Sequence, residues 1–117
     1  MERPCRTAWP PSRSVPAFLM ARFDIYTIEG IDAYFIEVQS DTLMPLNTTV
    51  VVPLLPVERK HIKRLNPTFV INGERLTMQT QDIAAVRRSE LKSCVGKIPE
   101  DQETDVTAAL DILFFGC

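Results

Sequence analysis

Alternating apolar and polar positions follow residue 20 and predict strands in the first half of the chain. Phe23, Ile25 and Thr27 alternate with more polar neighbours, a period of two that suits a strand with one buried face. After a turn at residues 30–32, residues 34–38 are expected to form the returning strand. Residues 50–55 predict a short, nearly all-apolar strand, in which Pro53 favours an edge position or a bulge.

The clearest local signal is a hairpin over residues 69–78. Asn72 and Gly73 separate two apolar runs, and this pair suits a type I′ turn because both central residues need positive φ. Residues 83–86 and 91–95 predict two further short strands, the second closed by Gly96.

Helical periodicity begins only after Pro99. Asp101 or Thr104 is expected to cap the helix, whose acidic first turn favours its positive end. Gly116 is expected to end it. Its apolar stripe falls at i, i+3, i+4 and i+7: Val106, Ala109, Leu110 and Leu113. Ile112 and Phe115 lie off that stripe. Five or six short strands and a terminal helix predict a mainly β fold, a small SH3-like barrel with a C-terminal α-helix.

The first 19 residues differ from the rest. They hold four of the nine prolines, a density that blocks helix and sheet alike. We expect a disordered Pro/Arg-rich extension, or sequence upstream of a true start at Met20, ahead of one domain over residues 20–117. Deleting residues 1–19 is expected to leave folding and binding unchanged.

Composition narrows the class of function. The chain has 117 residues, 45% hydrophobic, with a formal charge of −2 and a pI near 5.4. This acidic balance disfavours direct nucleic-acid binding and an anionic membrane. No apolar run approaches the ~20 residues that a transmembrane helix needs. Three cysteines at unrelated spacings signal neither a disulfide framework nor a zinc site, and favour a reducing cytoplasm. No cofactor is indicated.

One basic cluster and one histidine are candidates for chemistry. Arg59, Lys60, Lys63 and Arg64 lie in a segment that can form a brief helical turn, and their plainer interpretation is a solvated face over a loop. His61 has no second histidine and no nearby cysteine, so a metal site is not predicted.

Residues 113–117 place two aromatic side chains and a glycine after the amphipathic segment. Chain ends are normally polar and frayed. Such apolar weight is either packed into a core or presented as a contact surface. Given the family resemblance described next, we expect Phe114 to pin the helix into a dimer core, and Phe115 with Gly116 to make the contact.

Five stretches of residues 20–117 together match one family pattern. In chain order they are Phe23 with Tyr26-Thr27, Val38-Gln39-Ser40-Asp41, Val52-Pro53-Leu54, Met78 with Thr80, Asp82, Ala84 and Val86, and the final helix, residues 102–117. Through them the chain from residue 20 to 117 resembles the CcdB family of plasmid and chromosomal toxins, which poison DNA gyrase, and the final helix is similar nearly position by position.

The resemblance implies a bacterial, cytoplasmic homodimer whose SH3-like core is shared with the MazF and Kid ribonucleases. In the gyrase poisons a Trp-Gly-Ile carboxyl end inserts into the gyrase A subunit, where the tryptophan stacks on an arginine, and traps the cleaved DNA complex. A CcdA-like antitoxin with a disordered tail holds the toxin. Such a toxin is a stoichiometric inhibitor, not an enzyme. The implied gyrase-binding residues are Phe115, Gly116 and Cys117, with Phe114, Asp111, Thr42 and Leu43 as neighbouring contacts.

Two residues depart from the family's pattern. Phe115 replaces tryptophan, and phenylalanine is the weaker cation–π partner, by on the order of 0.5–2 kcal/mol per subunit. Cys117 replaces isoleucine with a smaller thiol that can oxidise if exposed. Two alternatives therefore stay open. One is a non-toxic relative that only binds an antitoxin, as a decoy or co-repressor. The other is a MazF-like endoribonuclease using Arg75, Arg59 and His61, for which the domain's acidic charge makes a poor RNA surface.

Overall fold

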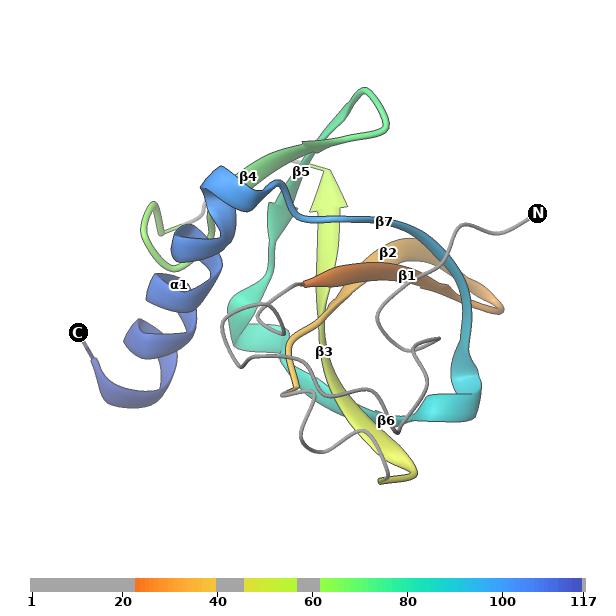
Figure 1. The fold of residues 1–117 in the computed structure, drawn as a ribbon. Coiled ribbons are helices and arrows are strands. Elements are labelled where there is room, and N and C mark those ends of the chain that lie inside the picture. The colour runs from red at the N-terminus through yellow and green to blue at the C-terminus, as the bar shows by residue number, and fades with distance from the viewer. Residues whose placement is uncertain (1–22, 40–45, 57–61, 117) are drawn as a thin grey trace.

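The computed structural model describes residues 23–39, 46–56 and 62–116. Its main feature is one curled antiparallel sheet with a single α-helix packed beside it (Figure 1). The described strands are β1 (Asp24–Ile28), β2 (Ile31–Glu37), β3 (Thr48–Pro56), β4 (Thr68–Ile71), β5 (Glu74–Met78), β6 (Ala84–Arg87) and β7 (Leu91–Lys97). The helix is α1 (Glu103–Phe115), and three short 3₁₀ turns are η4 (Thr80–Asp82), η5 (Arg88–Glu90) and η6 (Glu100–Gln102). The prediction of a mainly β small barrel with a C-terminal helix is confirmed.

The sheet runs in the order β4-β5-β3-β2-β1-β7, and β6 pairs separately with β3. Strand β1 pairs with β2 on one side and with β7 on the other, so segments far apart in the sequence are neighbours. The core between the curled sheet and α1 is made of fully buried apolar side chains: Ile25, Ile36, Val52, Leu54, Phe69, Met78, Ile98, Val106 and Ala109.

Pro53 lies inside the sheet and not on an edge strand, so that part of the prediction was wrong. Strand β3 pairs with β6 as far as Val51 and with β5 only from Leu54. The Pro53 carbonyl, which accepts a bond of 2.9 Å from the Gln79 amide, faces this side of β3. An amide at residue 53 would point to the same side, into the gap between the two partner strands. Proline therefore costs no ladder hydrogen bond there.

The hairpin is confirmed at the expected turn. Asn72 has a φ of 52° and Gly73 a φ of 82°, the pair of positive values that a type I′ turn requires. Strand β7 continues through Gly96 to Lys97, two residues beyond the expected end, because it pairs with β1 over that stretch.

The expected helix cap was wrong. Gln102 occupies the N-cap position of α1 and makes no side-chain capping bond. Asp101 lies in the preceding 3₁₀ turn, and Thr104 lies inside the helix. The 3₁₀ turn closes onto Pro99, whose carbonyl accepts the Gln102 amide at 2.8 Å. As a result the N-cap position falls on Gln102, one residue after Asp101, whose side chain would cap well.

Candidate functional site: the end of helix α1

The carboxyl end of α1 projects from the barrel while the first half of the helix is anchored to it. Val106 and Ala109 are completely buried, and Leu110 packs against the same core. Figure 1 shows the helix running along the barrel and its C-terminal end pointing away from the sheet. The predicted stripe is thus the anchoring face, although Leu113 at its end is only half-buried. The last turn keeps its conformation because it is part of the helix. It is exposed because the sheet does not extend to it.

Two adjacent aromatic side chains occupy that last turn. Phe114 is 60% exposed and Phe115 is 76% exposed. Their ring centroids lie 6.5 Å apart with the ring planes tilted by 59°, which is within the range of edge-to-face aromatic pairs. Phe114 lies outside the barrel core that the described residues form, and its expected burial in a dimer core stays a prediction.

Gly116 ends the helix as predicted. Its φ of 79° is left-handed, and its amide donates to the Ile112 carbonyl at 3.0 Å. This is the usual C-terminal αL cap, a conformation in which a side chain is strained. The glycine therefore both completes the last turn and keeps the backbone beside the two rings accessible.

Asp111 joins the aromatic pair from one turn earlier. It is exposed and precedes Phe114 and Phe115 by three and four residues, the spacing at which side chains share a helix face. The structure therefore brings together four of the predicted contact residues: Asp111, Phe114, Phe115 and Gly116. Cys117, Thr42 and Leu43 lie outside the described residues.

The chemistry of this helix end suits a cationic partner. The last turn of α1 contains no basic residue. A carboxylate beside two exposed aromatic rings suits a guanidinium group. Such a group forms paired hydrogen bonds with the carboxylate and stacks on an aromatic ring. The groups that the described residues of this helix end offer, a carboxylate and two aromatic rings, are suited to binding.

The residues nominated for RNA cleavage are not brought together in the described part of the chain. Arg75 is exposed on β5, whereas Arg59 and His61 lie outside the described residues. Among the residues that the structure describes, no cluster of three or more histidine, cysteine or acidic side chains has the geometry to hold a metal ion. No described helix is long and apolar enough to cross a membrane.

A buried polar network, not foreseen from the sequence, holds the turn at residues 62–66. Asn66, only 2% exposed, donates from Nδ2 to the Met78 carbonyl at 2.9 Å and to Gln81 Oε1 at 2.7 Å. Its Oδ1 accepts the Ile62 amide at 2.9 Å, and the Thr80 hydroxyl donates to the Leu65 carbonyl. The only sequence signal was the Asn-Pro pair. This network holds the backbone of the turn that carries Lys63 and Arg64, whose side chains are exposed, as expected for a solvated face over a loop.

A second network secures the segment that leads into β3. The Arg88 guanidinium lies 2.9 Å from the Glu37 carboxylate, which also accepts the Thr49 hydroxyl at 2.6 Å. The Arg88 amide donates to the Asn47 carbonyl at 2.7 Å. Glu37 is 3% exposed, and burial of a carboxylate is tolerable only with such partners.

Comparison with known proteins gives one family and one fold. The family model described as CcdB protein matches residues 22–116. The structure is similar to the crystal structure of an Mtb toxin, with 14% identity, a TM-score of 0.66 and coverage of 77% of this chain and 99% of that chain. It is also similar to the Mycobacterium tuberculosis toxin MazF-mt6, with 12% identity, a TM-score of 0.66 and coverage of 80% and 95%.

A third solved structure is an endoribonuclease in complex with its cognate antitoxin from a mycobacterial species. Identity is 12%, the TM-score is 0.63 and coverage is 78% of this chain and 88% of that chain. At such identities these likenesses establish the fold alone. Comparison with curated protein sequences gives no significant match.

Proposed function

Because this chain belongs to the CcdB family, we propose that it is the toxin of a toxin–antitoxin pair and that it inhibits DNA gyrase by stoichiometric binding. The observation that carries the proposal is the open aromatic pair on the last turn of α1, 60% and 76% exposed at Phe114 and Phe115. Apolar area of this size on a rigid terminus is characteristic of a binding hot spot.

The proposed contact is made with the gyrase A subunit. Phe115 takes the place of the tryptophan in the Trp-Gly-Ile end of the gyrase poisons and stacks on an arginine of the target. Gly116 allows close approach of the backbone, and Asp111 supplies a carboxylate to the same guanidinium. Binding at the cleaved DNA complex then blocks its religation.

Two copies of the chain are proposed to act together. A two-fold dimer presents the helix end twice and matches a two-fold target. It also offers a second subunit to cover Phe114, which the chain's own barrel leaves open. A CcdA-like antitoxin with a segment that folds on binding is the proposed regulator. Sedimentation at micromolar concentration tests the dimer, and a monomer contradicts it.

The proposed mechanism requires a surface and no catalysis. The endoribonuclease alternative is supported by the shared fold, and two of its three nominated residues, Arg59 and His61, lie outside the described part of the chain. The decoy alternative differs in one respect that an experiment can measure. A decoy tolerates loss of Phe115 and Gly116, whereas a gyrase poison does not.

The test is gyrase supercoiling and DNA cleavage in vitro with the purified full chain. We expect the wild type to inhibit supercoiling and accumulate cleaved DNA, and a Phe115→Ala, Gly116→Glu double variant to do neither. Ile31→Ala is the matched control, since Ile31 is an apolar side chain, 51% exposed, on β2. If gyrases from several hosts are unaffected by the wild type, the gyrase proposal is wrong. Incubation of the purified chain with RNA tests the ribonuclease alternative. If the RNA stays intact, that alternative is excluded.

A further inference from the structure

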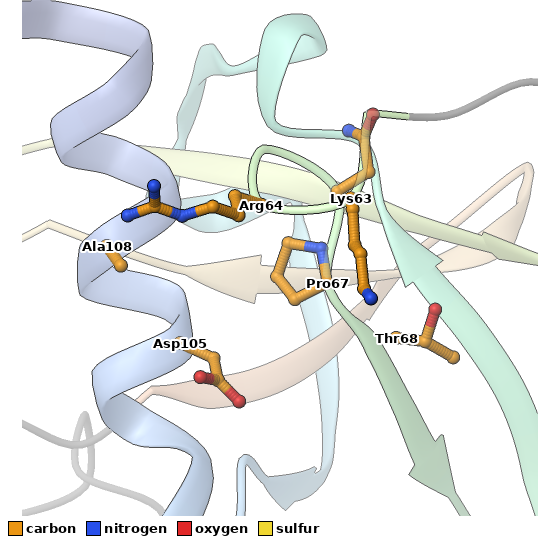
Figure 2. Close-up of a pocket in the computed structure, with 7 residues that line it drawn as sticks. Lys63, Arg64, Pro67, Thr68, Asp105 and Ala108 are labelled. Atoms are coloured by element: carbon orange, nitrogen blue, oxygen red, sulfur yellow. The ribbon is translucent and has the colours of Figure 1, made fainter. Parts of the chain in front are cut away.

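Two cavities in the described part of the chain differ in charge. The cavity of Figure 2, between helix α1 and the turn that carries Lys63 and Arg64, has a volume of about 410 Å³ and two basic lining residues. The second cavity has a volume of about 230 Å³ and is lined from β1, β2, β3 and β5. Its charged lining residues are Asp32 and Glu74, and none of its lining residues is basic. The second cavity therefore attracts a cation.

Apolar side chains form the floor of this second cavity. Leu54 and Leu76 are 1% and 3% exposed and belong to the barrel core, against which Tyr34 packs. Tyr34 lies opposite Leu54 in the pairing of β2 with β3, so the two side chains share the inner face of the sheet. The floor is thus suited to an aliphatic stem, and the Tyr34 ring adds an aromatic surface that favours a cation nearby.

Two carboxylates flank this floor from opposite sides. Asp32 precedes Tyr34 by two residues on β2, and Glu74 precedes Leu76 by two residues on β5, so each shares the inner face with its neighbour. Strand β3 lies between β2 and β5, which places the two backbones roughly 10 Å apart. Neither carboxylate makes an ion pair or a hydrogen bond with a residue that the structure describes.

The strands around the cavity have no free edge at its floor. Tyr34 is paired with Thr27 on one side and with Leu54 on the other, and Leu54 is paired in turn with Met78. An extended partner segment therefore finds no backbone groups to pair with there. The volume of about 230 Å³ also lies below the roughly 300–1,000 Å³ of pockets for drug-sized ligands. Both observations favour a small free molecule over a polypeptide.

We propose that this cavity binds a short aliphatic diamine, with one ammonium group at Asp32, the other at Glu74 and the apolar stem across the floor. Both amines of such a molecule are protonated at neutral pH, and each donates a hydrogen bond to one carboxylate. The stem covers apolar surface of Leu54 and Leu76. Two carboxylates without partners match two positive charges, whereas a monoamine leaves one carboxylate unpaired.

The site is independent of what the helix end contacts, because none of its lining residues belongs to α1. It also differs in charge and in lining residues from the cavity of Figure 2. The proposal therefore does not depend on the proposed inhibition of gyrase.

The test is titration of the isotope-labelled full chain with diaminopentane at low ionic strength, followed by amide chemical shifts. We expect saturable shifts in β2, β3 and β5 around the cavity, and weaker binding when salt is added, because exposed charges are screened. Pentylamine has the same stem and one charge, and should bind at least threefold more weakly. Pentanediol has no charge and should cause no saturable shift.

A pair of double variants separates the cavity from the rest of the acidic surface. Asp32→Asn combined with Glu74→Gln removes both charges with little change in side-chain shape, and should weaken diaminopentane binding at least fivefold. The matched control, Glu100→Gln combined with Asp101→Asn, removes two exposed charges outside the cavity and should change the Kd less than twofold. Thermal unfolding of both double variants establishes that each is folded.

Three results overturn the proposal. They are the absence of saturable shifts around the cavity, equal weakening by the cavity variant and its control, and binding of pentylamine or acetyl-lysine methylamide as tight as that of the diamine. The last result would assign the cavity to a single basic side chain of a protein. A negative gyrase assay changes none of these readouts.

Discussion

Replacement of Asn66 should destabilise the barrel more than any other single change to an uncharged polar side chain in the described chain. Pro67 has no amide to donate to the Met78 carbonyl, and Asn66 Nδ2 takes that role at 2.9 Å. Met78 is completely buried. Asn66→Ala therefore leaves a carbonyl inside the core without a partner, and also removes the bonds to Gln81 and to the Ile62 amide.

The magnitude follows from these three bonds. A buried carbonyl left without a partner costs about 1–3 kcal/mol, and each of the two more exposed bonds contributes about 0.5–1 kcal/mol. The expected loss in the free energy of unfolding is about 3 kcal/mol. For a domain of this size, each kcal/mol shifts Tm by about 4–8 °C, so Tm should fall by at least about 12 °C.

Thermal and urea unfolding followed by circular dichroism measure this loss. Asn47→Ala is the control, because Asn47 is exposed, and it should stay within about 0.5 kcal/mol of the wild type. Adding Pro67→Ala to Asn66→Ala restores an amide opposite Met78 and should recover about 1 kcal/mol. An Asn66→Ala variant that melts within 3 °C of the wild type refutes the role assigned to this side chain.

Further predictions concern other parts of the fold. Arg88→Met should cost about 3 kcal/mol in urea unfolding because Glu37 stays buried without its cation, and adding Glu37→Gln should recover most of that loss. Equal destabilisation by the single and the double variant contradicts this. Gly73→Val should cost about 1–2 kcal/mol in the same assay, since a branched side chain strains the positive φ of the hairpin turn; an unchanged midpoint contradicts it. Phe114→Ala and Phe115→Ala should change the free energy of unfolding of the monomer by less than about 0.5 kcal/mol. If the gyrase proposal holds, Phe115→Ala weakens inhibition by about 2–3 kcal/mol, or about 30–150-fold in Kd, as expected for burial of roughly 100 Å² of ring.

Local backbone chemistry made much of the fold predictable. The Asn72-Gly73 turn and the end of α1 at Gly116 were predicted correctly because they depend on residues that tolerate positive φ: two in the turn and one at the helix end. The start of α1 was misplaced because two side chains capable of capping compete with a 3₁₀ turn set by Pro99, and no local rule ranks them. Pro53 was assigned to an edge because the gap in pairing that accommodates it lies between β5 and β6, two strands that come later in the sequence.

The candidate site was predictable only where it lies on one helix. Asp111, Phe114 and Phe115 come together through helical spacing alone, which the sequence displays directly. The cavity of Figure 2 joins residues 63–68 to residues 105–108. Neither segment carries a sequence pattern that indicates the other. They come close only because Val106 and Ala109 pack into the core of the barrel, which other strands form.

That closure has a kinetic consequence. Strand β1 has its second neighbour only in β7, where Asp24 lies opposite Lys97 and Ile25 opposite Gly96. Such distant pairing is slow to form, because the loop entropy is lost before the contacts are gained. Until β7 arrives, β1 exposes a hydrogen-bonding edge beside Ile25 and Tyr26, and the partly folded chain is most open to proteases and to self-association. The helix α1 follows β7 directly and packs on the same core through Val106 and Ala109. We therefore expect a chain caught before closure to be the form most easily degraded and to lack an ordered contact surface.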